Sequence, residues 1–157
     1  MKDISLLGHP IITMHKVCFL NEKIQDHLLK KKLDLSLSQY MVLVFLSLKP
    51  GQSQEDLAVR RNSTEASISR TVKILIRKKF ITCQPDLADK RKKKLFLSGS
   101  GQKLLVRAKN IVSQEFNSFL REIDKDEGEE LERNLEKILK AITDRGQRLS
   151  IIKQENK

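Results

Sequence analysis

Three helix-start signals in close succession constrain the fold of this chain more than any other feature. Ser36 and Gln39 form a capping-box pattern, in which the Ser hydroxyl accepts from the backbone ahead and the Gln reaches back. Ser53 with Asp56 repeats this three-residue spacing, and Thr64 is a favourable N-cap. The pattern predicts three helices in quick succession.

The breaks between these signals predict where each helix ends. Lys49-Pro50-Gly51 ends the first helix, and Asn62-Ser63 ends the second, which runs through Ala58 or Arg60. The third runs to about Lys79, and its expected buried stripe is Ile68, Val72, Leu75 and Ile76. The second and third helices, joined by a tight turn, make a candidate helix-turn-helix.

Two strands are expected directly after these helices. Phe80 to Cys83 and Lys94 to Ser98 flank a polar loop that contains Pro85 and ends in the basic run Lys90 to Lys94. The second segment alternates with the period of two that a half-buried strand requires. A basic hairpin placed after a helix-turn-helix is a wing, so the sequence predicts a winged helix.

The positive charge of the chain is concentrated on this region. The net charge is +11, and residues 60–94 alone hold 12 Lys and Arg against three acidic residues. The other 122 residues therefore contribute only +2. A local positive field is typical of a surface that binds a polyanion such as nucleic acid. The basic run has no apolar face of its own, which disfavours a membrane surface as partner.

Long apolar helices are expected on both sides of the winged helix. One begins near Pro10 and carries an apolar face from Leu7 to Leu28. Another is capped by Ser98 to Gly101 and continues to a break at Asp124 to Gly128. The last carries apolar residues from Leu131 to Ile152 at nearly heptad spacing. These faces are too long for a small core to cover, so they predict a homodimer.

The exposed face of the helix that follows Thr64 is the first candidate site. At 100° per residue, Ala66, Arg70, Lys73 and Arg77 lie opposite the apolar stripe. Small residues let the helix approach the major groove, and Arg reaches guanine edges or phosphates. For an isolated helix an ordinary solvated face would be the better interpretation, but the basic hairpin that follows favours DNA. The candidate recognition residues are Thr64, Ala66, Ser67, Ser69, Arg70, Lys73 and Arg77.

The tip of the hairpin is the second candidate site. Lys92, Lys93 and Lys94 would bind phosphates as flexible point charges. Arg91 lies two residues from Asp89, so the carboxylate can orient the guanidinium before DNA arrives. The alternative is a plain surface ion pair, which contributes little.

Other reactive residues form no recognised pattern. Cys18 and Cys83 lack the spacing of a zinc ribbon and are expected to be buried core thiols. His15 and Cys18 would be half of a zinc site, so neither a metal nor a cofactor is expected. The motifs GxxxxGK[ST], HExxH and GxSxG are absent, which disfavours an enzyme. Without an apolar span or a signal-peptide layout, the expected location is cytoplasmic.

Residues 35–101 resemble the MarR (multiple antibiotic resistance regulator) family. The resemblance rests on LSLSQYMVL, SQEDLA, TEASISRTVKIL and DLADKRKKKLFLSGSG. It implies interlocked N- and C-terminal helices in a dimer, and an effector pocket between the dimerisation and DNA-binding parts. It also implies that Arg91, beside Asp89, enters the minor groove. Many members have an acidic residue and a Gly after the recognition helix, where this chain has Ile76 and Lys79, which predicts a reshaped start of the wing.

The expected fold is α+β and mostly helical. A winged helix-turn-helix occupies residues 35–101, and dimerisation helices occupy 1–34 and 102–157. We expect a homodimeric regulator that binds double-stranded DNA at an inverted repeat, acting as a repressor that a small effector releases. The first alternative is an architectural protein that coats DNA without an effector. A winged helix that binds protein or RNA is the second.

Overall fold

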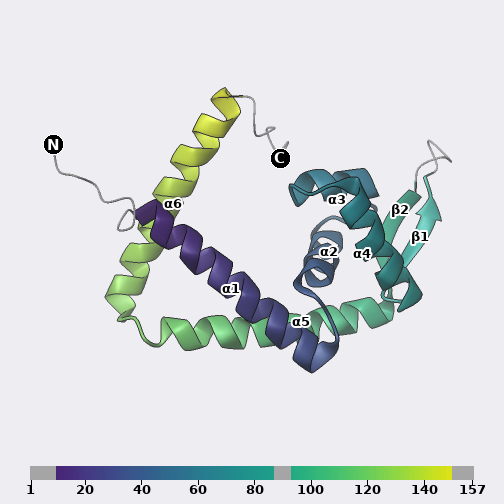
Figure 1. Cartoon of the computed structure of the whole chain (residues 1–157), viewed down its shortest axis with the longest axis horizontal. Coiled ribbons are helices and arrows are strands. Elements are labelled where there is room, and N and C mark those ends of the chain that lie inside the picture. Colours follow the sequence, from purple (N-terminus) through teal and green to yellow (C-terminus); the bar gives the residue numbers. More distant parts are fainter. Residues whose placement is uncertain (1–9, 87–92, 150–157) are drawn as a thin grey trace. The chain divides into compact units, whose positions relative to one another are not determined.

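The computed structural model describes residues 10–86 and 93–149 (Figure 1). In chain order the described elements are α1 (Pro10–Leu33), α2 (Leu37–Leu48), α3 (Gln54–Arg60), α4 (Glu65–Arg77), β1 (Ile81–Pro85), β2 (Lys93–Leu97), α5 (Gly99–Leu120) and α6 (Lys125–Arg148). The chain divides into two compact units, residues 1–113 and 114–157. The expected α+β, mostly helical fold is confirmed.

The predicted N-caps are confirmed at the starts of α2, α3 and α4. Ser36 Oγ accepts the backbone N–H of Gln39 at 3.2 Å, and Gln39 Oε1 accepts the N–H of Ser36 at 3.1 Å. Ser53 and Asp56 form the same reciprocal pair, at 3.1 and 2.9 Å. Thr64 Oγ1 accepts from the third backbone N–H that follows it, at 3.3 Å. Each cap satisfies helix donors that otherwise lack a partner, which contributes about 1 kcal/mol.

The core of the first unit lies where α2 packs against α1, α4 and β2. Each fully buried aliphatic side chain there contributes about 1.5–3 kcal/mol by leaving water. Ile76, expected on the buried stripe of α4, is instead 38% exposed, because it lies about 100° further round the helix than Leu75. The side chains with under 2% of their surface exposed are Leu29, Leu35, Val42, Leu43, Leu46, Leu57, Ile68, Val72, Leu75 and Leu95.

The predicted hairpin is present, and its base is joined by a segment that the sequence did not predict. β1 and β2 pair antiparallel, from Ile81 opposite Leu97 to Pro85 opposite Lys93. On the other edge of β2, the backbone N–H of Gly51 donates to the carbonyl of Leu95, and the N–H of Leu95 donates to the carbonyl of Gln52, both at 3.0 Å. The turn after α2 therefore anchors the base of the hairpin.

Gln52 also ties this turn to α2 through its side chain. Its amide nitrogen donates to the carbonyls of Phe45 and Lys49, each at 2.8 Å, and the residue is only 4% exposed. Carbonyls at the end of a helix lack partners within the helix. Gln52 therefore caps α2 and holds the hairpin against it.

The two cysteines correct the expectation of buried thiols. Cys18 and Cys83 are both free and exposed. Cys18 lies on the part of α1 that includes Val17 and Leu20, which are 60% and 57% exposed. In β1 only Ile81 is buried, because the hairpin extends away from the core beyond that residue. Apolar spacing alone did not distinguish a face packed within one chain from a face left open.

The helix of the second unit, α6, begins earlier in the chain than the sequence predicted. Asp124 accepts the N–H of Asp126 at 3.1 Å and forms a capping box with Glu127, so Asp124 to Gly128 starts α6 instead of separating two helices. The apolar side chains of α6 are exposed, and Leu131, Leu135, Ile138 and Ile142 expose 45%, 42%, 39% and 47%. The described part of this unit has an apolar face without a cover of its own.

Gly101 gives the first testable prediction. A Cβ at this buried position would overlap the carbonyl oxygen of Phe80, which accepts the N–H of Ser98 at 3.0 Å. We therefore expect Gly101→Ala to lower the free energy of unfolding by about 1–3 kcal/mol. Urea unfolding measures the change. Gly128→Ala is the matched control, since no atom lies within 4 Å of its Cβ, and it should raise helix stability by about 0.5–1 kcal/mol. Equal stability of Gly101→Ala and the unchanged protein would contradict this packing.

Candidate nucleic-acid interface

The two faces of α4 differ sharply. Ile68, Val72 and Leu75 are at most 1% exposed, whereas Arg70 and Lys73 are exposed on the other side. The residues predicted to lie opposite this stripe, Ala66, Arg70, Lys73 and Arg77, span about 60° of the helix circumference. Of the predicted recognition residues, Ser69 is half-buried, and the exposed ones are Thr64, Ala66, Ser67, Arg70, Lys73 and Arg77.

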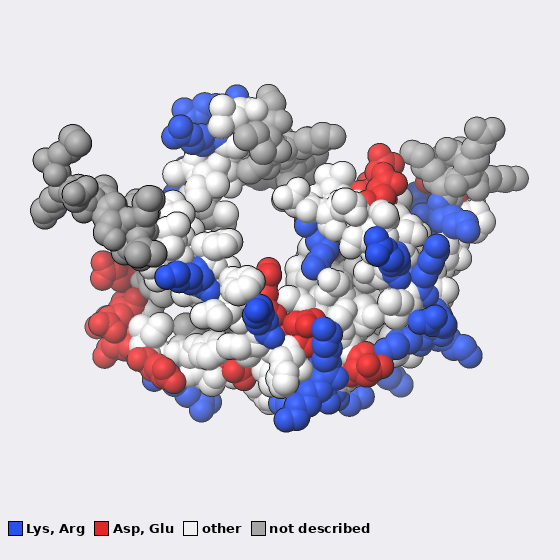
Figure 2. Space-filling model, viewed as in Figure 1, with Lys and Arg blue, Asp and Glu red and all other residues white. Residues whose placement is uncertain are grey.

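The cations of α4 are held by few local interactions. Arg70 Nε donates to the carbonyl of Ala66 at 3.3 Å, one turn back along the helix. Among residues 10–86 and 93–149, no carboxylate lies within ion-pair distance of Arg70, Lys73 or Arg77. Their charges are therefore available to an anionic partner. Figure 2 shows basic side chains gathered over this part of the molecule.

The predicted wing residues fall partly outside the described structure. Asp89, Arg91 and Lys92 lie outside the described residues. Lys93 is exposed at the open end of β2, while Lys94 Nζ lies 3.4 Å from a carboxylate oxygen of Asp86. Neighbouring side chains on a strand point to opposite faces, so the two lysines do not share one surface.

The junction between α4 and the wing is a tight, well-bonded turn. The N–H of Lys79 donates to the carbonyl of Ile76 and the N–H of Phe80 donates to that of Leu75, both at 2.9 Å, which is a Schellman motif. Lys79 has a φ of 61°, in the left-handed region that glycine prefers. The turn thus has the left-handed conformation that glycine usually supplies at the end of a helix, although the residue here is a lysine.

Hydrogen bonds and an ion pair hold this junction to α1 and α5. The hydroxyls of Ser98 and Ser100 donate to the carbonyl of Lys79 at 2.7 and 2.8 Å. Lys78 Nζ lies 2.6 Å from Asp34 Oδ2, and this hydrogen-bonded ion pair lowers the pKa of the Asp34 carboxyl. The C-terminal end of α4 is therefore fixed, and its exposed face keeps one orientation.

Two arginines beside the recognition helix were counted in the charge but not predicted as site residues. Arg60 and Arg61 end α3, and the guanidinium of Arg60 lies 5.3 Å from the ring centroid of Phe45. Arg61 donates to the hydroxyl of Ser38 at 3.1 Å. The signal in the sequence was an Arg pair just before the turn at Asn62, and only packing shows that both side chains lie against α2.

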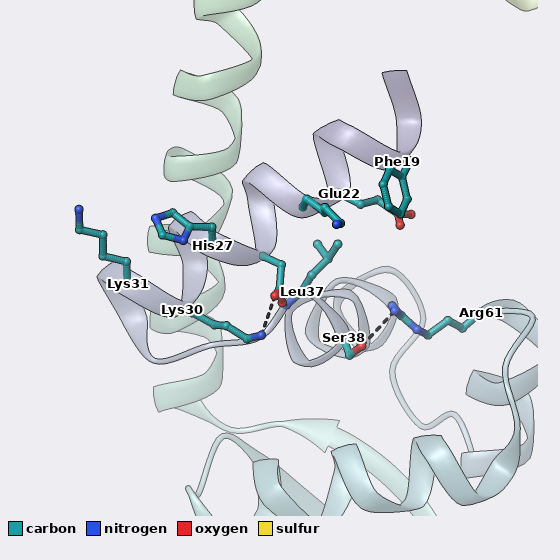
Figure 3. Close-up of a pocket in the computed structure, with 10 residues that line it drawn as sticks. Phe19, Glu22, His27, Lys30, Lys31, Leu37, Ser38 and Arg61 are labelled. Atoms are coloured by element: carbon teal, nitrogen blue, oxygen red, sulfur yellow. Dashed lines mark hydrogen bonds and ion pairs between the residues drawn. The ribbon is translucent and has the colours of Figure 1, made fainter. Parts of the chain in front are cut away.

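A groove of about 800 Å³ runs between α1 and the start of α2 (Figure 3). Asp26 on α1 accepts the N–H of Leu37 at 2.9 Å and pairs with Lys30 at 2.6 Å. The Lys30 hydrogen bond, helped by the backbone N–H of Leu37, lowers the pKa of the Asp26 carboxyl despite partial burial. Phe19 and Arg61 also line the groove, which therefore offers both apolar and cationic surface.

Comparison with known proteins identifies the winged helix. The sequence profile of the MarR family matches residues 33–92. This segment, from the end of α1 through β1, is therefore similar to the MarR family. A stretch of 74 residues is also 38% identical to the HTH-type transcriptional regulator YybA of Bacillus subtilis, which covers 47% of this chain and 49% of YybA. The chain thus spans about half the length of that relative.

Solved structures share the fold of this chain. The transcriptional regulator BldR from Sulfolobus solfataricus is 26% identical, with a TM-score of 0.75 over 90% of this chain and 99% of BldR. A complex of MepR from S. aureus with DNA is 24% identical, with a TM-score of 0.70 over 88% of this chain and 99% of MepR. At that identity the MepR likeness shows the fold alone. The predicted winged-helix architecture is confirmed. In the described residues, no helix is both long and apolar enough to cross a bilayer.

Lys79 gives the second testable prediction. Lys79→Gly relieves a side chain held in left-handed backbone, so we expect the free energy of unfolding to rise by about 0.5–1 kcal/mol. Urea unfolding of the full chain measures the change. In the control Lys73→Gly, the glycine falls inside α4 at helical geometry, and stability should drop by about 1 kcal/mol. A Lys79→Gly chain less stable than the parent would show that the junction does not store this strain.

Proposed function

We propose that this chain is a sequence-specific regulator of transcription that binds double-stranded DNA in the cytoplasm, and that it is not an enzyme. The observation that carries the proposal is the division of α4 into a buried apolar stripe and an exposed basic face. A helix held rigidly with one cationic face outward fits the major groove of a duplex. The MarR-family match of residues 33–92 and the DNA-bound MepR structure support this function.

The recognition residues divide into four roles. Ala66 is small and lies at the start of α4, where it lets the backbone approach the groove. Arg70 reads a guanine through two parallel hydrogen bonds, because its guanidinium has a fork of donors. Lys73 and Arg77 follow at one-turn spacing and neutralise phosphates. Three hydroxyls at the N-terminal end of the helix bond to phosphate or base edges, and they belong to Thr64, Ser67 and Ser69.

The wing supplies contacts of a second kind. Arg91, oriented by Asp89, enters the minor groove, where a narrow A·T-rich stretch deepens the negative potential. Lys92, Lys93 and Lys94 contact phosphates without reading sequence. In the structure Lys94 lies near Asp86, so it contributes less to phosphate binding than Lys93 does.

The apolar faces of α1 and α6 support a homodimer. Val17 and Leu20 on α1 are more than half exposed, and four aliphatic side chains on α6 expose between 39% and 47% of their surface. Exposed aliphatic rows of this length need a cover in water, and a second copy of the chain supplies one. A two-fold dimer presents two recognition helices, so its DNA site is an inverted repeat.

Repression with release by a small effector is the regulatory mode that we propose. A homodimer seated on an inverted repeat occludes the DNA that it covers. The groove between α1 and α2 is a suitable effector site, because it joins the proposed dimerisation helix to the DNA-binding region. A ligand there would change the position of α2 and hence of α4, which packs on it.

The role of Arg70 gives the third testable prediction. We expect Arg70→Ala to weaken binding to a specific duplex by about 1–3 kcal/mol, with a smaller loss on random DNA, because a base contact is lost. Fluorescence anisotropy on both duplexes measures the difference. Arg70→Lys is the matched control: it keeps the charge but loses the fork, so it should restore random-DNA affinity and not specificity. Equal losses on the two duplexes would make Arg70 a phosphate contact.

A further inference from the structure

A second cavity, which shares Lys30 and Lys31 with the groove on α2, lies beyond the C-terminal end of α4. Its volume is about 560 Å³, and its walls come from the last turn of α1, the α4–β1 junction and the first three turns of α5. The cations at its rim are Lys31, Lys32, Lys103 and Arg107, and Lys30 and Asp34, which both take part in ion pairs, line it as well. Phe80 and Leu104 supply apolar surface, with Leu104 only 7% exposed.

The charges around this cavity are not balanced from within. Lys30 is paired with Asp26, and Asp34 is paired with Lys78, each at 2.6 Å. In the described part of the chain, none of the four rim cations has a carboxylate within ion-pair distance. Four like charges around one small cavity repel one another, and a bound anion removes that repulsion.

Ordinary helix electrostatics explains only part of this arrangement. Lys31 and Lys32 end α1, where positive charge is favoured by the helix dipole. Lys103 and Arg107 are four residues apart on α5, so their like charges repel each other. Their positions suit a bound anion better than they suit the helix.

The cavity lies past Arg77, the last residue of α4 that we propose to contact DNA. The 13 residues of α4 span about 20 Å. In Figure 1, α3 lies at the opposite side of the winged helix from the start of α5. The basic side chains at the lower edge of Figure 2, where α1 ends, are therefore open to another anion.

We propose that this cavity binds a small organic phosphate that carries several negative charges and a flat apolar group. The charged groups lie between Lys31, Lys32, Lys103 and Arg107, whose side chains suit phosphate oxygens. The flat group lies on the ring of Phe80 and on Leu104. Nucleotides have this chemistry, and their size fits 560 Å³.

Binding there is coupled to the recognition helix through Phe80. This residue joins α4 to β1, and its N–H donates to the carbonyl of Leu75 at 2.9 Å. A ligand on Phe80 therefore contacts the end of α4. By thermodynamic linkage, the ligand changes the affinity for DNA by the same factor as DNA changes the affinity for the ligand. This coupling rests on the proposed DNA-binding function, whereas binding of the phosphate does not.

Calorimetric titration of the full chain with ATP, inorganic triphosphate and adenosine tests the site, without Mg²⁺ at about 0.15 M salt. We expect ATP to bind once per chain, triphosphate to bind at least about tenfold more weakly, and adenosine not to bind. The double variant Lys103→Gln/Arg107→Gln should lose about tenfold or more in ATP affinity. The matched control Lys16→Gln/Lys109→Gln, with the same change of net charge, should keep the parental affinity.

Four outcomes would overturn the proposal. One is that ATP does not bind the parent, and another is that the control pair loses as much affinity as the cavity pair, which would leave only a general charge effect. Triphosphate binding as tightly as ATP would remove the role of Phe80 and Leu104. A titration with duplex DNA tests the other source of phosphate. If the cavity variant reduces the slope of log affinity against log salt concentration by about two, these cations contact DNA instead. Because the titration contains no DNA, its result is independent of the proposed function.

Discussion

The structure depends on the packing of the apolar stripe of α4 against α2. Ile68, Val72 and Leu75 are almost fully buried, and α2 in turn contacts α1 and β2. With that stripe fixed, the helix has no freedom to rotate, and Arg70 and Lys73 must face solvent. Thr64 fixes the start of the helix, while the Schellman turn at Lys79 fixes its end. The orientation of the basic face therefore follows from core packing. Because the face is rigid, a partner that binds it loses less free energy to ordering the surface.

Local signals made the winged helix predictable, because each depends on residues only a few positions apart. The capping pairs at Ser36 and Ser53 work within a single turn, and the wing follows from alternation in Lys94 to Ser98. Contacts across long separations were beyond such signals. Gln52 bonds to α2 and β2 at once, and no pattern marks it. Cys18 was misjudged because an apolar face has the same spacing whether a core or a second chain covers it.

The positive charge of the chain lies on two surfaces, and we propose a different anionic partner for each. One is the exposed face of α4 with the wing, where cations at one-turn spacing match an extended row of phosphates. The other is the cavity at the start of α5, where four cations converge on a small volume that suits a compact anion. Phe80 lies between them, since it follows α4 and lines the cavity. In this proposal the ligand site lies at the base of the helix that binds DNA.

The central claim is that a dimer reads DNA sequence through α4 and the wing. Sequencing of the genomic fragments that the purified full chain retains, at about 0.15 M salt, tests it most directly. The account predicts enrichment of one inverted repeat, with half-sites about 10 base pairs apart or a multiple of that spacing. Even coverage of the genome, without a shared motif, would contradict the claim and identify the chain as a protein that coats DNA without reading it.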